Sequence, residues 1–166
     1  MNRLHQLYME MIRYYQGDAA RIQHFVKVHS FAKYIGEAEG LTETVQITLE
    51  AAALVHDIGI RAAEKKYGYS NGKLQEQEGP PLALEMLENL DFDAPVIERV
   101  CYLVAHHHTY EPVDGLDYRI LLEADALVNL YEDAVHEEGV KAAYEHIFKT
   151  ETARNICRMM FEIEKR

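Results

Sequence analysis

Apolar residues recur every three or four positions along most of the chain, which is the spacing of one buried helix face. The first stretch with this rhythm covers residues 4–15 and stops before Gly17. The second follows Asp18, a residue type that favours helix N-caps, and ends near Gly36. We therefore predict two helices at this end of the chain.

The same spacing predicts further helices, with Thr42 and Thr150 as candidate N-caps and Asp93 as part of a start signal before Pro95. They cover residues 42–56, 82–90, 96–104, 120–130, 140–148 and 154–163. The rhythm weakens over 61–79, where 67–73 has loop composition, and a second loop is expected over 109–115. There is no strand-like alternation, repeat or linker, so we expect an all-α helical bundle of about seven to nine helices.

Composition narrows the class of protein. The 166 residues include 48% hydrophobic and 27% charged residues, with a formal net charge of -11, which favours one globular domain spanning 1–166. Such a charge disfavours binding to long nucleic acids or anionic membranes. Two cysteines, Cys101 and Cys157, are too few for a disulfide framework. Without a membrane-spanning stretch or the apolar core of a signal peptide, we expect a cytoplasmic protein.

Several apolar helices carry an imidazole or a carboxylate at a position expected to be buried. His24 lies near the apolar face of its helix, and His56-Asp57 ends an alanine-rich helix. Asp125 interrupts the apolar stretch 121–128. A buried carboxylate without a partner is unfavourable, and a metal site in a helix bundle needs this combination of side chains. Mixed nitrogen and oxygen ligands suit Fe, Mn, Co, Ni, Zn or Mg.

The segments 21–28, 51–59 and 123–125 resemble, in this order, the HD-domain metal-dependent phosphohydrolase superfamily. The alanine-rich run that ends in His-Asp-Ile-Gly is the most specific part, and the resemblance covers about 20–130. It implies an all-α fold of the HD type with N- and C-terminal helices packed on that core. It also implies that His24, His56, Asp57 and Asp125 bind the principal divalent metal.

Some HD proteins hold a second metal that Asp57 would bridge, so the resemblance allows one or two ions. Similar dinuclear members place a histidine where this chain has Glu78, before Gly79-Pro80-Pro81. Glu78 is then either an oxygen ligand of a second ion or a cap of the helix that Pro80 begins.

The other ligand of a second ion is expected from His106-His107-His108. Successive residues of a helix differ in direction by about 100°, so at most one or two of the three can face one site. By the resemblance, His107 is the expected ligand, with His106 next, and His108 contacts substrate or solvent. The triplet could instead be a solvated helix C-terminus.

Many relatives have a lysine where this chain has Ile60, so a cation that contacts phosphate must come from elsewhere. Arg21 and Lys27 flank His24, and Lys73 lies on the segment after the motif. We name these three as candidate substrate-binding residues, although each could be an ordinary solvated surface charge.

The resemblance implies hydrolysis of a small phosphorylated molecule, such as a nucleotide, phosphate monoester or phosphoanhydride, by a hydroxide generated on the metal. Asp57 would orient the nucleophile, and any histidine not on the metal could protonate the leaving group. We therefore name Asp57, His107 and His108 as the candidate catalytic residues. The alternatives are a dinuclear iron oxygenase and a non-catalytic metal- or nucleotide-binding module. The last helix carries an apolar face that suits the core or a homodimer, formed by Ile156, Met159, Met160 and Ile163.

Overall fold

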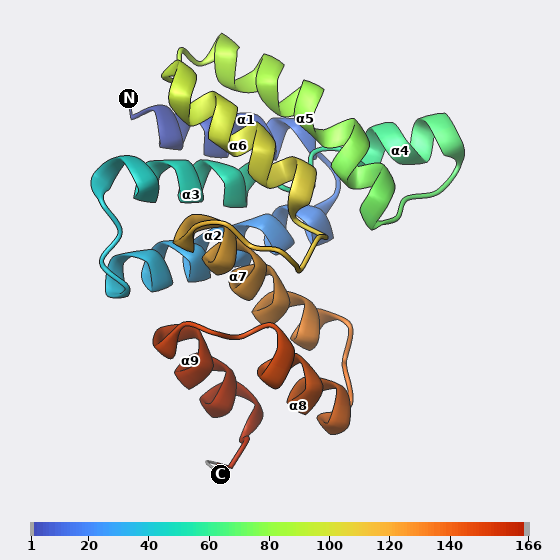
Figure 1. Cartoon of the computed structure of the whole chain (residues 1–166). Coiled ribbons are helices and arrows are strands. Elements are labelled where there is room, and N and C mark those ends of the chain that lie inside the picture. The colour runs from blue at the N-terminus through green and yellow to red at the C-terminus, as the bar shows by residue number, and fades with distance from the viewer. Residues whose placement is uncertain (1, 165–166) are drawn as a thin grey trace.

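The computed structural model describes residues 2–164, which form nine α-helices and no strand (Figure 1). The helices are α1 (Arg3–Tyr14), α2 (Ala19–Ala38), α3 (Glu43–Val55), α4 (Ile60–Tyr67), α5 (Gly72–Asn89), α6 (Ala94–His106), α7 (Leu116–Glu132), α8 (Glu137–His146) and α9 (Glu151–Phe161). The predicted all-α class is therefore confirmed.

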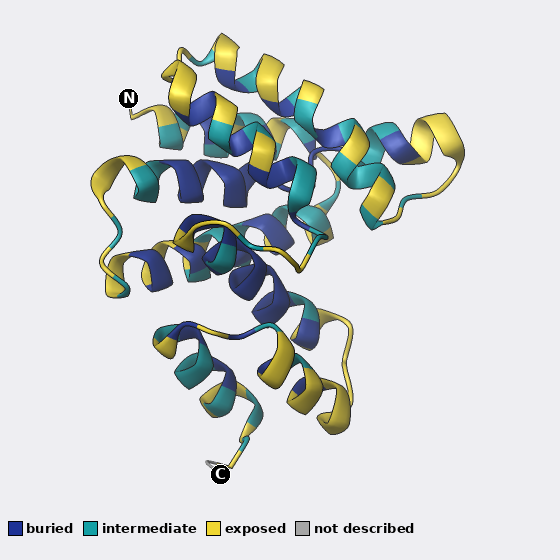
Figure 2. Cartoon of the chain, viewed as in Figure 1, coloured by how far each residue is buried: buried dark blue, intermediate teal, exposed yellow. Residues whose placement is uncertain are grey.

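Two central helices, α3 and α7, are buried over most of their length (Figure 2). Every residue of 48–55 in α3 and of 117–128 in α7, except Arg119, is buried. Helix α2 packs against both, while α6 packs on α3 and α5 packs along α6. A polar side chain on α3 or α7 therefore points into the interior, where it needs a partner.

Two of the predicted N-caps make the expected hydrogen bonds. The Asp18 carboxylate accepts from the Arg21 amide at 3.2 Å, and the Thr150 hydroxyl accepts from the Ala153 amide at 3.2 Å. Thr42 occupies the N-cap position of α3 without a side-chain bond. These short-range signals are reliable because a cap depends only on neighbouring residues.

The segment after the His-Asp turn is more helical than the sequence indicates. The predicted loop over 67–73 shrinks to residues 68–71, since α4 ends at Tyr67 and α5 already begins at Gly72. Only Ala63 is buried in α4, which explains its weak apolar rhythm. The Asn71 side chain caps α5 by accepting from the Leu74 amide at 2.9 Å.

Helices α8 and α9 lie at one end of the molecule and are attached through a buried carboxylate of α7 (Figure 1). Glu123, which is 0% exposed, accepts from the Thr150 hydroxyl at 2.9 Å and from the Lys149 amide at 3.3 Å. Burial raises the pKa of Glu123 to about 7 although these donors favour its charged form.

The apolar face of α9 divides between the core and the surface. Ile156 packs on the core, as does Ile163 just beyond α9, whereas Met159 is 74% and Met160 is 40% exposed. A homodimer formed through this face stays a prediction. No helix of residues 2–164 has the length and apolar character that a membrane crossing requires.

Candidate metal centre

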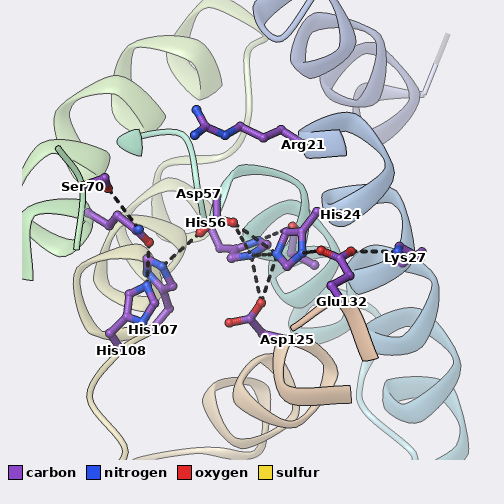
Figure 3. A network of polar contacts seen from close by, with 12 residues as sticks. Arg21, His24, Lys27, His56, Asp57, Ser70, His107, His108, Asp125 and Glu132 are labelled. Atoms are coloured by element: carbon purple, nitrogen blue, oxygen red, sulfur yellow. Dashed lines mark hydrogen bonds and ion pairs between the residues drawn. The ribbon is translucent and has the colours of Figure 1, made fainter. Parts of the chain in front are cut away.

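Residues from four separate parts of the fold meet at one point of the interior (Figure 3). His24 lies in the second turn of α2 and Asp125 in the middle of α7. His56 ends α3 and is followed by Asp57 in the turn to α4, while His107 ends α6. His56 is 0% and His107 is 1% exposed, so the cluster is largely shielded from solvent.

The inner ring nitrogens and the carboxylates are within a few ångströms of one another. His24 Nε2 and His56 Nε2 are 3.2 Å apart. Asp125 Oδ1 lies 3.2 Å from His24 Nε2 and 3.3 Å from His56 Nε2. Asp57 Oδ2 lies at the same 3.2 and 3.3 Å from these two nitrogens. Two imidazoles and two carboxylates thus surround one small volume.

The outer nitrogen of each buried imidazole faces an acceptor. His56 Nδ1 donates to the Ala53 carbonyl at 2.8 Å, and His107 Nδ1 donates to the Val104 carbonyl at 2.7 Å. His24 Nδ1 donates to Glu132 Oε2 at 3.2 Å. A neutral imidazole with its proton on Nδ1 presents a lone pair at Nε2, so all three rings aim lone pairs inward.

This arrangement suits a divalent cation. Among the described residues, the buried atoms Asp125 Oδ1 and His107 Nε2 have no hydrogen-bond partner, although other acceptors lie close to them. Lone pairs directed at carboxylate oxygens repel unless a cation lies between them. Two nitrogens bound to one tetrahedral ion are about 3.3 Å apart, close to the separation of His24 from His56. The donors therefore fit a metal ion.

The charges of the cluster explain why it attracts cations. Burial alone would lower the pKa of His24, but the Asp125 and Asp57 carboxylates outweigh it and raise the pKa to about 9. Burial likewise opposes a charged His56, yet Asp57 and Asp125 raise its pKa well above the ordinary value. The pKa of Asp125 is lowered, since His24 and His56 outweigh the effect of burial. The two carboxylates thus favour positive charge at this point, which either protons on the imidazoles or a bound cation can supply.

A second group of donors shares Asp57 with the first. Asp57 Oδ1 lies 3.5 Å from His107 Nε2, and His108 offers a further ring nitrogen within reach of both. The His108 Nε2 donates to Gln75 Oε1 at 2.6 Å, and Gln75 in turn donates to Ser70 at 3.1 Å. Burial, followed by the neighbouring His107, lowers the pKa of His108 to about 4, which keeps this ring neutral.

The three histidines of the triplet have different surroundings. His106 turns away from the cluster and stacks on Tyr102 with ring centroids 4.2 Å apart. His107 faces Asp57, and its role as a ligand of a second ion stays a prediction. Glu76 holds this turn by accepting from the His108 amide at 2.9 Å and the Thr109 hydroxyl at 2.8 Å.

Glu78 is placed differently from both sequence expectations. It lies inside α5, because Pro80 and Pro81 are interior residues of that helix, so its role as a cap of a helix beginning at Pro80 is wrong. Its carboxylate lies 3.2 Å from Lys66 Nζ and accepts from the Tyr67 hydroxyl at 3.0 Å. The structure thus directs Glu78 toward α4 and does not bring it into either group of donors.

Two of the three candidate substrate cations have acidic partners. Arg21 lies 2.6 Å from Glu64 and 3.6 Å from Asp18, and the Lys27 ammonium lies 2.7 Å from Glu132 Oε1. Lys73 is exposed in the first turn of α5, next to Gly72, which is in close contact with the His108 ring. The structure therefore leaves Lys73 at the side of the site where His108 lies.

Some residues at the site are absent from the sequence interpretation. Tyr15 is 1% exposed and donates its hydroxyl to the Asp57 carbonyl at 2.6 Å, while Tyr14 donates to the Ile58 carbonyl at 3.0 Å. Nothing in the sequence indicates this support from α1. Helical spacing could have identified Glu132, since it follows Asp125 by seven residues and therefore lies on the same face of the helix.

Known proteins share this fold. A family model described as HD domain matches residues 21–130. The crystal structure of a predicted HD superfamily hydrolase from an uncultured Thermotogales bacterium superposes with a TM-score of 0.69 and 24% identity, covering 96% of this chain and 86% of that one. No curated protein matches the sequence. With its His56-Asp57 pair at the centre of the converging side chains, the chain belongs to the HD domain family.

Proposed function

We propose that this protein is a metal-dependent phosphohydrolase that acts on a small phosphorylated molecule. The observation that supports it most is the inward convergence of three imidazole Nε2 atoms, from His24, His56 and His107, on the carboxylates of Asp57 and Asp125. The similar protein from the Thermotogales bacterium carries the description of a predicted hydrolase, which agrees with this proposal.

His24, His56, Asp57 and Asp125 would hold the principal ion, and Asp57 with His107 and His108 would hold a second ion if one binds. A bound divalent cation would lower the pKa of water and polarise a phosphoryl oxygen. Asp57 offers both its oxygens to the interior, one on each side, and would orient the attacking oxygen. The Tyr15 hydroxyl on the Asp57 carbonyl keeps this turn in place.

If no second ion binds, His108 is the ring best suited to a role in proton transfer or substrate binding. Gln75 accepts from its Nε2, so Nδ1 carries the lone pair and is free to accept a proton or a hydrogen bond. Lys73 is our first candidate for contact with the phosphate, since Arg21 and Lys27 already have carboxylate partners. At net charge -11, a small substrate fits better than a long polyanion.

The test begins with protein freed of metal by a chelator and reloaded separately with Mn²⁺, Fe²⁺, Co²⁺, Ni²⁺, Zn²⁺ or Mg²⁺. Phosphate release is measured from nucleotides, sugar phosphates and a chromogenic phosphate monoester. We expect metal-dependent turnover that falls at least about 100-fold in Asp125→Asn, because one interior oxygen is replaced by an amide nitrogen. A protein that binds metal but hydrolyses none of these phosphates, while consuming oxygen with iron, would contradict the proposal.

A further inference from the structure

The His24 ring lies between two carboxylates of the same helix. Asp125 Oδ1 is 3.2 Å from His24 Nε2, and Glu132 Oε2 is 3.2 Å from His24 Nδ1 (Figure 3). Asp125 and Glu132 are seven residues apart on α7, which is about two helical turns and brings them to one face. One straight helix thus contacts both nitrogens of one imidazole.

The other two imidazoles of the cluster do not need such a partner. His56 and His107 each follow the last residue of a helix, where carbonyls are free to accept, and they donate to Ala53 and Val104. His24 lies in the interior of α2, where the helix itself uses the backbone carbonyls. An acceptor for His24 Nδ1 must therefore come from another element, and Glu132 supplies it.

Lys27 contacts the other oxygen of the Glu132 carboxylate. Lys27 is one turn after His24 on α2, and its ammonium lies 2.7 Å from Glu132 Oε1, leaving Oε2 for the imidazole. The ammonium also lies 5.8 Å from the centroid of the Tyr131 ring. Glu132 is just outside the residues 21–130 that the family model matches, so the match does not account for it.

We propose that Glu132 is a positioning residue for the metal centre, and that Lys27 orients Glu132 instead of binding substrate. The Glu132 carboxylate holds the His24 proton on Nδ1 and keeps the Nε2 lone pair directed at the ion. This inference rests on the proposed metal-dependent function. Partners of this kind typically change metal affinity by about 10–100-fold when removed.

The test uses Co²⁺ and the full chain, with binding measured by calorimetry at constant pH. Glu132→Leu removes the acceptor, whereas Glu132→Gln removes the charge and keeps a carbonyl oxygen that can accept from His24. Asp133→Asn removes the neighbouring exposed carboxylate and serves as the matched control for charge. We expect the Kd for Co²⁺ to rise about 10–100-fold in Glu132→Leu, less in Glu132→Gln, and less than about twofold in Asp133→Asn.

A second readout distinguishes positioning from general support of the fold. In the Co²⁺ protein, the paramagnetic ion shifts the proton NMR signals of the Nδ1 protons of His24, His56 and His107. Each of these protons exchanges slowly with water only while it is hydrogen-bonded. Glu132→Leu should broaden the His24 signal, assigned by nuclear Overhauser effects to neighbouring residues of α2, and leave the other two sharp. Glu132→Gln should restore it.

The outcomes separate the two proposals. If wild-type protein binds no Co²⁺, the proposed metal-dependent function is overturned. If wild-type protein binds Co²⁺ and Glu132→Leu matches it in both Kd and proton signals, only the role of Glu132 is overturned. Lys27→Met should also raise the Kd for Co²⁺. If this variant keeps the wild-type Kd for Co²⁺ but binds substrate more weakly, Lys27 is a substrate-binding residue and does not orient Glu132.

Discussion

At the scale of single residues, the chemistry of the centre depends on where each imidazole carries its proton. A histidine in an apolar helix can face the core in either tautomer, and its hydrogen-bond partner decides which one forms. His56 and His107 use carbonyls at their own helix ends, whereas His24 of α2 uses a carboxylate of α7. The lone pairs of His24 and His56 consequently point to Asp57 and Asp125, and that of His107 points to Asp57.

We expect His56→Ala to abolish stable binding of the principal ion, since it removes an inward nitrogen from the most buried position of the cluster. Metal per chain, measured by mass spectrometry after purification without chelator, should fall to well below that of wild type.

His106→Ala is the matched control for this experiment. His106 also belongs to the end of a helix, but it stacks on Tyr102 outside the cluster, so metal content should stay at the wild-type level. Equal loss of metal in both variants would show that the cluster is not the binding site.

At the scale of elements, close contact of backbones positions the His-Asp turn against α5. A Cβ atom on Gly59 would lie 2.7 Å from the Gly79 amide nitrogen and 3.0 Å from the Gln75 carbonyl oxygen. A Cβ on Gly79 would lie 2.7 Å from Val104 Cγ1 of α6. Two glycines thus let α5 lie directly on the turn that carries Asp57.

Gly59→Ala should therefore destabilise the protein by about 1–3 kcal/mol, because backbone atoms must move to admit the methyl group. The change is measured by urea unfolding of metal-free protein. Gly139→Ala is the control: its Cβ would meet only the end of the exposed Val135 side chain, so the change should be small or stabilising. A similar loss of unfolding free energy in both variants would argue against the close backbone contact between Gly59 and α5.

A buried carboxylate also joins α2 to α3. Glu50 contacts His29 Nε2 at 3.0 Å and accepts from Gln46 at 3.1 Å. Burial would raise the pKa of Glu50, but these hydrogen bonds and the nearby Lys33 outweigh it and lower the pKa below the ordinary 4.5. A lowered pKa means stability that is present above pH 4.5 and lost as the pH falls through the folded-state value.

We expect Glu50→Gln to lose about 1–3 kcal/mol of unfolding free energy at pH 7, because it leaves the half-buried His29 without its charged acceptor. The difference from wild type should shrink as the pH falls below 4.5, and urea unfolding across this range measures it. Glu98→Gln, an exposed glutamate of α6, should change stability by less than about 0.5 kcal/mol at either pH. A deficit in Glu50→Gln that grows on acidification would contradict the sign of this pKa shift.

At the scale of the whole molecule, negative charge surrounds a site that itself favours cations. The chain carries 28 acidic and 17 basic residues, and several basic side chains near the site are paired with carboxylates. We therefore expect a metal ion bound at the site to attract substrate anions, since the electrostatic field of the whole protein is negative and repels them.

This charge distribution predicts no affinity for long nucleic acids. Fluorescence anisotropy with labelled single- and double-stranded DNA at 0.15 M salt should show no binding at protein concentrations up to about 100 µM, where non-specific binders are bound. Binding that weakens steeply with added salt would show a cationic surface that the charge count conceals.

Much of the fold follows from the order of apolar residues and caps, because helix formation and capping are local. Asp18 and Thr150 cap helices where the sequence predicts. For the segment from Ile60 to Gly79 the sequence predicts less helix than the structure contains. The reason is that α4 exposes most of its surface and α5 continues through Pro80 and Pro81. Tertiary packing on Gly59 and α6 stabilises α5 there, and local propensity does not report such packing.

For the candidate site, the sequence by itself determined which residue types could meet: His24, His56, Asp57 and Asp125 stand out as polar groups in apolar helices. Only the tertiary structure decided their partners. It directed Glu78 toward Lys66, turned His106 outward, and brought Glu132 to His24 across a separation of 108 residues. The physical reason is that burial can be inferred from local periodicity, whereas a hydrogen-bond partner depends on how distant helices pack.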